Sequence, residues 1–217
     1  MTRQLKRRWA AARLGRVASH PRAALGFRVH TGRAMVVALG GPAQAPEILA
    51  KGRIDVAFTF EEGAVYHVAQ ELPFEEARAL LQDAEARFGE RARAELAAFI
   101  ARLGVPVVAA GLAAATARPL PPLPAILKSH PLAHAAEGEL YRAVFAGASA
   151  ALGAAPARVA ADRLPHQIAT ALGVTTARVS EHLAQMGKAS GRPWAADQKQ
   201  AALAAWLALA GISSSTG

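Results

Sequence analysis

The segment with the most chemistry-bearing side chains runs from His130 to Tyr141 and reads His-Pro-Leu-Ala-His-Ala-Ala-Glu-Gly-Glu-Leu-Tyr. His134 and Glu137 are three residues apart, so on a helix they share one face, and His130 joins them only if the helix begins before Pro131. An imidazole beside a carboxylate can bind a transition metal, or form an acid–base pair in which the carboxylate fixes the histidine tautomer. The same spacing fits a structural pair at a helix start, and the sequence leaves both interpretations open.

Three further residues are candidates because of their expected places at element ends. His30 stands beside Thr31 and Gly32 at the end of an expected strand, where it is either a site residue or a turn histidine. Asp197 falls in the first turn of an expected helix, where it is either a metal ligand or a carboxylate that compensates the helix dipole. Lys199 follows two residues later and either neutralises a phosphate or is merely solvated.

The elements that must position these residues follow from apolar periodicity. Residues 25–39 predict two strands joined at Thr31-Gly32-Arg33, and the alternation in residues 51–60 predicts a third, which makes an antiparallel meander. Pro73 introduces a long amphipathic helix over residues 74–103, and the apolar run 105–112 predicts a doubly buried strand that pairs in parallel with the first. Residues 132–152, 165–172, 177–187 and 195–210 predict helices, and residues 157–163 predict a short fifth strand.

This order of elements resembles the ribonuclease H-like superfamily, which includes Holliday-junction resolvases and transposases. Two segments carry the resemblance beyond topology: Phe27-Arg-Val-His-Thr-Gly-Arg-Ala-Met-Val-Val37, and Trp194-Ala-Ala-Asp-Gln-Lys-Gln-Ala-Ala-Leu-Ala-Ala-Trp206. The resemblance covers about residues 25–210. It implies an α/β fold of the ribonuclease H-like type, with a mixed five-stranded sheet of three antiparallel strands and then parallel strands, flanked by helices.

The resemblance also implies a metal site, from which this sequence departs. On the matching helix, Asp197 would be the C-terminal metal-binding carboxylate, and the cofactor would be Mg²⁺ or Mn²⁺. Members that cut nucleic acid carry an aspartate on the first strand, because two metal ions need bridging carboxylate oxygens. Here that strand has Val29 and His30, and residues 105–112 supply no acid. Imidazole is a poor ligand for Mg²⁺, which prefers oxygen.

The net charge of +9 is concentrated at the N-terminus. Residues 1–22 hold seven positive charges and no carboxylate, which leaves +2 for the rest of the chain. Such an arm is either a solvated leader or a phosphate-binding segment that releases counterions on binding. We expect a basic arm over residues 1–22, one α/β domain over 23–212 and a flexible tail over 213–217. The arm cations predicted to contact nucleic acid are Arg3, Lys6, Arg7, Arg8, Arg13 and Arg16.

Several classes of protein are excluded. The chain has no cysteine, so it has no disulfide, thiolate nucleophile or cysteine-ligated metal. It contains no GxxxxGK[ST], GxGxxG, HExxH or GxSxG motif. No uncharged stretch reaches the roughly 20 apolar residues of a membrane span, and no secretory signal is evident. We expect a cytoplasmic bacterial protein that does not interact with membranes.

These observations predict a protein that binds or cleaves nucleic acid. If it is a metal-dependent nuclease, its site is assembled from His30, His134, Glu137 and Asp197, with His134, Glu137 and Asp197 as metal ligands. Two alternatives stay open: a degenerate, non-catalytic ribonuclease H-like binding or assembly module, and a small-molecule hydrolase that uses the His134–Glu137 pair.

Overall fold

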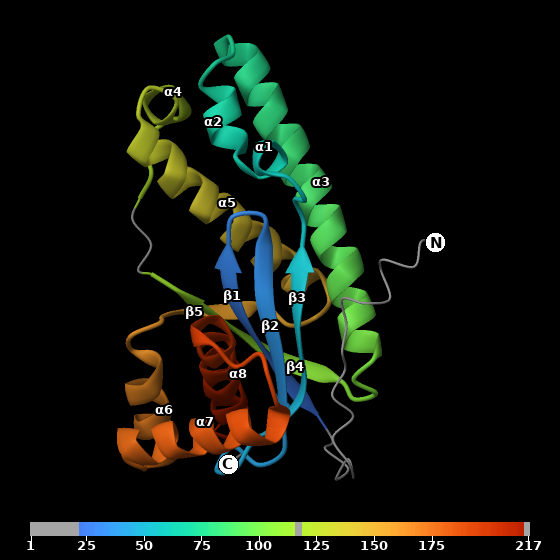
Figure 1. The fold of residues 1–217 in the computed structure, drawn as a ribbon, viewed down its shortest axis with the longest axis vertical. Helices are drawn as coiled ribbons and strands as arrows, with labels where there is room; N and C mark the ends of the chain where they lie inside the picture. Colours follow the sequence, from blue (N-terminus) through green and yellow to red (C-terminus); the bar gives the residue numbers. More distant parts are fainter. Residues whose placement is uncertain (1–21, 116–118, 215–217) are drawn as a thin grey trace.

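Five strands form one mixed sheet in the computed structural model, which describes residues 22–115 and 119–214 (Figure 1). The strand order is β3-β2-β1-β4-β5. β2 pairs antiparallel with both β1 and β3, whereas β4 pairs in parallel with β1 and β5 in parallel with β4. The strands are β1 (Ala23–His30), β2 (Arg33–Gly40), β3 (Glu47–Asp55), β4 (Val107–Ala114) and β5 (Pro156–Ala160). The predicted strand directions are therefore confirmed.

The expected hairpin forms around a two-residue turn in which Gly32 has a φ of +72°, a conformation that costs glycine little. His30 pairs with Arg33 across this turn. The third strand was predicted over residues 51–60, whereas it forms over Glu47–Asp55. The difference arises because Thr59 caps a helix within the predicted range. Its side chain accepts a hydrogen bond from the backbone N–H of Glu62, so β3 ends at Asp55 and helix α1 begins at Phe60.

The five longest helices were predicted, with differences of a few residues at their ends. They are α3 (Phe74–Ala101), α5 (His130–Ala151), α6 (Leu164–Leu172), α7 (Thr176–Ser190) and α8 (Ala196–Ser214). Three short helices were not predicted, since four or five residues are too few to show a helical period. They are α1 (Phe60–Gly63), α2 (Val65–Ala69) and α4 (Leu123–Ile126).

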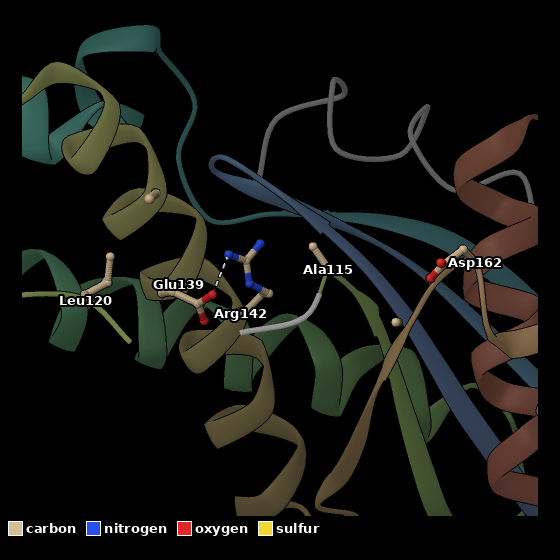
Figure 2. Close-up of a pocket in the computed structure, with 7 residues that line it drawn as sticks. Ala115, Leu120, Glu139, Arg142 and Asp162 are labelled. Carbon is tan, nitrogen blue, oxygen red and sulfur yellow. Dashed lines mark hydrogen bonds and ion pairs between the residues drawn. The ribbon is translucent and has the colours of Figure 1, made fainter. Parts of the chain in front are cut away.

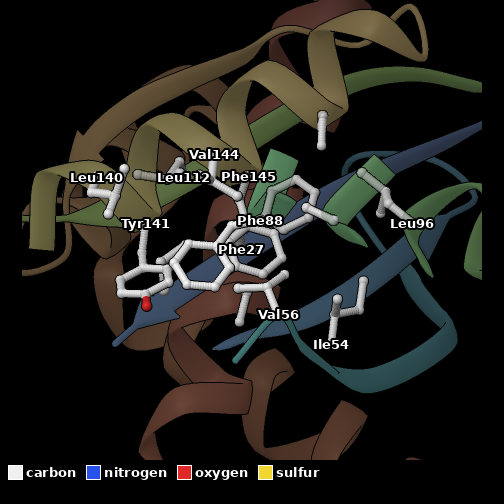
Figure 3. Close-up of a cluster of buried hydrophobic side chains, with 14 of the residues drawn as sticks. Phe27, Ile54, Val56, Phe88, Leu96, Leu112, Leu140, Tyr141, Val144 and Phe145 are labelled. Carbon is white, nitrogen blue, oxygen red and sulfur yellow. The ribbon is translucent and has the colours of Figure 1, made fainter. Parts of the chain in front are cut away.

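The helices cover both faces of the sheet and close a core on each (Figure 1). α3 and α5 pack on one face around a cluster of rings that includes Phe27, Phe88, Tyr141 and Phe145 (Figure 3). α6, α7 and α8 pack on the other face, where the core is rich in alanine. Alternate residues of β1 therefore face different cores: Phe27 and Val29 face α3 and α5, whereas Gly26, Arg28 and His30 lie on the α8 side.

Two glycines let α8 approach the sheet unusually closely. An added Cβ at Gly26 would lie 1.9 Å from the carbonyl oxygen of Ala201, and one at Gly111 would lie 2.3 Å from that of Ala204. The alanines of α8 at this contact, Ala201, Ala204 and Ala205, are buried, and their small side chains suit the close approach. This close contact places the N-terminal end of α8 beside the carboxyl end of β1.

Candidate functional site

His30 and Asp197 meet at the carboxyl end of β1. His30 Nε2 lies 3.0 Å from Asp197 Oδ1, in an orientation that does not satisfy hydrogen-bond geometry, and Arg28 Nε lies 4.0 Å from the same oxygen. All three side chains are roughly one-third exposed. The strand-end histidine and the carboxylate in the first turn of the last helix, which were named separately as candidates, are therefore in contact. We call His30, Arg28 and Asp197 the sheet-end group.

The loop before α8 is tied to the sheet, which fixes where Asp197 stands. Lys51 on β3 donates hydrogen bonds to Ser190 Oγ at 3.2 Å and to the carbonyl oxygens of Gly191 and Pro193. Burial lowers the pKa of the Lys51 ammonium below its ordinary value. Gln198 accepts a hydrogen bond from the Ala195 N–H at 3.0 Å and so completes the helix start.

The sheet-end group lacks the ligands of a two-metal centre. At the end of β4 the residues are Ala113 and Ala114, and Ala113 contributes only a carbonyl oxygen, which lies 3.5 Å from Arg28 Nη1. The Arg28 Nε is buried and has no hydrogen-bond partner. Two hard cations would need several bridging oxygens, whereas Arg28 and His30 offer only the nitrogens of a guanidinium and an imidazole. The residues present therefore do not fit a pair of Mg²⁺ ions.

Glu137 lies elsewhere, buried between α5 and α2 on the other side of the sheet. Its Oε1 lies 2.8 Å from His67 Nδ1 and accepts hydrogen bonds from the backbone N–H groups of Tyr66 and His67. Ala64, the residue before α2, offers no capping side chain, so Glu137 satisfies the start of α2 from another helix. Only 2% of Glu137 is exposed. Burial of the Tyr66 hydroxyl is the main reason that its pKa is raised, and the negative charge of Glu137 adds to this.

The structure separates the four predicted site residues into two pairs. His134 Nδ1 lies 4.0 Å from Glu137 Oε2, while His30 and Asp197 contact one another on the α8 side. The sheet stands between the pairs, because α5 and α8 pack on opposite faces. The expectation that all four converge in one pocket is wrong, since a single sequence gives no information on which face each helix covers.

Sequence reasoning missed His67, whereas the condition stated for His130 is met. α5 begins at His130, ahead of Pro131, so His130 and His134 are both helical and lie one turn apart. Their rings contact that of His67, with centroids 4.6 Å and 4.3 Å from it. More than sixty residues separate His67 from His130. No local spacing could have revealed this group.

A third polar group lines a hollow between α5 and β5 (Figure 2). Arg158 donates to both oxygens of Glu139 at 2.7 and 2.8 Å, and Arg142 donates to one of them at 2.9 Å. These bonds, that from Arg158 above all, outweigh burial and lower the pKa of Glu139 to about 2. Asp162 lines the same hollow. The paired charges tie β5 to α5.

Basic side chains line a groove at the start of α8. Lys199, Lys188 and Arg192 surround it together with Trp194, and no carboxylate is among its described lining residues. The indole N–H of Trp194 is buried without a hydrogen-bond partner. Lys199 therefore joins a basic groove that continues from the helix turn carrying Asp197. We call Lys188, Arg192, Trp194 and Lys199 the α8 groove.

The remaining predicted nucleic-acid contacts, Arg3, Lys6, Arg7, Arg8, Arg13 and Arg16, lie outside the described residues. Within the described part of the chain, no helix combines the length and apolar character needed to cross a membrane.

Comparison with solved structures identifies the architecture. Thermus thermophilus RuvC in complex with a Holliday junction substrate superposes with a TM-score of 0.54 over 90% of this chain and 97% of that chain, at 9% sequence identity. The chain has a ribonuclease H-like fold. A second structure of Thermus thermophilus RuvC gives a TM-score of 0.52 over 89% of this chain and 97% of that chain, at 11% identity. No family model and no curated protein matches the sequence.

The ribonuclease H-like fold confirms the fold expected from the order of elements. At these low identities the likeness concerns the fold alone.

Proposed function

We propose that this protein binds nucleic acid through the sheet-end group and the α8 groove, as a ribonuclease H-like module that does not use two-metal cleavage. The observation that carries the proposal is that Arg28 and His30 of β1 both lie beside the Asp197 carboxylate at the carboxyl end of the strand. A guanidinium or imidazolium at this position attracts a phosphate directly, where a metal-dependent enzyme would place a cation.

The chemistry of the α8 groove supports the same partner. Three cations, without a carboxylate among the described lining residues, form the combination that follows a phosphate backbone. The groove and the sheet-end group share the start of α8, since Asp197 and Lys199 are two residues apart. A nucleic acid could therefore contact both. The basic arm over residues 1–22 would add counterion release without specifying sequence.

The test is equilibrium binding of the full chain to labelled DNA in a salt titration. A four-way DNA junction is the first probe, because the structural neighbour RuvC was solved with a Holliday junction substrate. Duplex and single-stranded DNA and RNA of equal length serve for comparison. We expect Arg28→Gln and Lys199→Gln each to weaken binding and to reduce the slope of log K against log salt by about one.

The matched control is Arg93→Gln, which removes an exposed arginine from α3 on the opposite face of the sheet. It should bind like the parent chain. A chain with glutamine at all six arm positions measures the contribution of the arm separately. If Arg28→Gln and Lys199→Gln bind as Arg93→Gln does, the proposed surface is wrong.

A cleavage assay with Mg²⁺ and with Mn²⁺ tests the non-catalytic part of the proposal. We expect no cleavage of any of the probes. Cleavage that Asp197→Asn abolishes would overturn this part and would return Asp197 to the role of metal ligand.

A further inference from the structure

Three imidazoles gather at the junction of α2 and α5. The ring centroids of His67, His130 and His134 lie 4.6, 4.3 and 4.6 Å apart, so the three form a nearly equilateral triangle. One ring nitrogen from each lies within 4.8 Å of the others. His67 is half-buried, whereas His130 and His134 are exposed.

The orientation of His67 is set by Glu137. Glu137 Oε1 already accepts hydrogen bonds from two backbone N–H groups, so it is also the acceptor in the 2.8 Å contact, in which Nδ1 of His67 donates the proton. In neutral His67 the lone pair is then on Nε2. This Nε2 is buried and has no hydrogen-bond partner. A buried polar atom without a partner is unfavourable unless a ligand satisfies it.

We propose that His67, His130 and His134 bind one transition-metal ion of the zinc type, and that Glu137 is the positioning residue that holds His67 toward it. A carboxylate that fixes the tautomer of a ligating histidine is the usual support of such sites. Imidazole nitrogen suits zinc, copper or nickel, whereas Mg²⁺ requires oxygen. The ligands lie on α2 and α5, which contribute to a different core from that of α8.

The distances permit the ion with small movements. Zinc–nitrogen bonds of about 2.0–2.1 Å in a tetrahedral site separate the ligand nitrogens by roughly 3.3 Å. The three nitrogens lie within 4.8 Å of one another, so each pair must approach by at most about 1.5 Å, and the two ligands that would move, His130 and His134, are exposed. The fourth position then faces solvent, and it would hold water or an anionic ligand.

The ion would add a further link between α2 and α5, beside the hydrogen bonds that Glu137 accepts from the start of α2. His67 lies on the five-residue α2, and the other two ligands lie on the first turn and a half of α5. Binding to the folded state alone raises the melting temperature. Metal binding and stabilisation of α2 on α5 are therefore expected together.

The experiment is titration of the EDTA-treated full chain with Zn²⁺ by calorimetry, with Mg²⁺ as the comparison ion. We expect one Zn²⁺ per chain, a higher melting temperature with Zn²⁺, and neither effect with Mg²⁺. His130→Ala and His134→Ala should each lower the affinity more than tenfold. The control is His166→Ala, an exposed histidine on α6, which should leave the affinity unchanged.

Glu137→Gln tests the positioning role, because glutamine still accepts the N–H bonds of α2 while losing the negative charge. It should lower the Zn²⁺ affinity about 10- to 100-fold. Its melting temperature in EDTA measures any structural cost separately. The visible spectrum of the Co²⁺-loaded chain should show tetrahedral coordination in the parent and lose it in His134→Ala. Equal Zn²⁺ affinity in the parent, His130→Ala and His134→Ala, or no Zn²⁺ binding by the parent, would overturn the proposal.

Discussion

Gly26→Ala tests whether the contact between α8 and β1 sets both the stability of the fold and the geometry of the sheet-end group. An added Cβ would lie 1.9 Å from Ala201 O and 2.4 Å from Ala205 N, where ordinary contacts are 3.4 Å or longer. Because both neighbours are backbone atoms, no side-chain rotation relieves the clash. α8 must therefore move outward by about 1.5 Å.

The energetic cost follows from this displacement. Overpacking a core usually costs about 1–3 kcal/mol, and it costs more where the neighbour is rigid. Here the displaced helix also loses part of the packing of Trp206 and Leu209, which are buried. We expect Gly26→Ala to lower the free energy of unfolding by about 3–4 kcal/mol, measured by urea denaturation. Asp197 is one helical turn before Ala201, so its 3.0 Å contact with His30 should lengthen as well.

Gly89→Ala is the matched control, because it adds the same methyl group within a helix. An added Cβ at Gly89 meets nothing within 4 Å, and the residue lies in the interior of α3. The substitution should stabilise the protein by about 0.5–1 kcal/mol, since alanine loses less backbone freedom than glycine on folding. Equal stabilities of Gly26→Ala and the parent would refute the close approach of α8 to β1. Destabilisation by Gly89→Ala would refute the open space beside Gly89.

Two further substitutions test polar contacts of the fold. Because the pKa of Glu139 falls from its ordinary 4.5 to about 2 on folding, its contribution to stability is present above pH 4.5 and is lost as the pH falls toward 2. Glu139→Gln should remove this part of the acid dependence, about 1–2 kcal/mol for these partly exposed pairs, in thermal denaturation measured as a function of pH. An unchanged acid profile would contradict the prediction. Tyr141 donates a buried hydrogen bond of 2.8 Å to Gly63 O, so Tyr141→Phe should cost about 1–2 kcal/mol in urea denaturation, and a neutral result would mean that the carbonyl finds another donor.

Much of the fold could be predicted because its signals are local or periodic. The turn at Gly32, the apolar period of α3 and the continuous apolar run of β4 each follow from neighbouring residues. The order of these elements was then enough to indicate the ribonuclease H-like arrangement. The end of β3 was misplaced and α1 was missed, because the Thr59 side chain caps a helix where the alternation of apolar residues predicted a strand.

The proximity of two of the candidate residues follows from the same local signals. His30 and Asp197 were both placed at element ends, and the topology brings them together. Glu137 was paired with His134 from helical spacing, whereas its main contacts are with His67 and the start of α2. Those contacts join residues about seventy positions apart, so no spacing rule could indicate them.

The sequence by itself determined the elements and their order, the missing strand acid, and the location of most of the net charge in residues 1–22. These properties depend on residue type and on near neighbours along the chain. Only the tertiary structure decided that His30 and Asp197 belong to one face of the sheet while His134 and Glu137 belong to the other, beside His67. That division depends on which face each helix buries, and the packing of α8 against Gly26 and Gly111 is a long-range contact that no local pattern encodes.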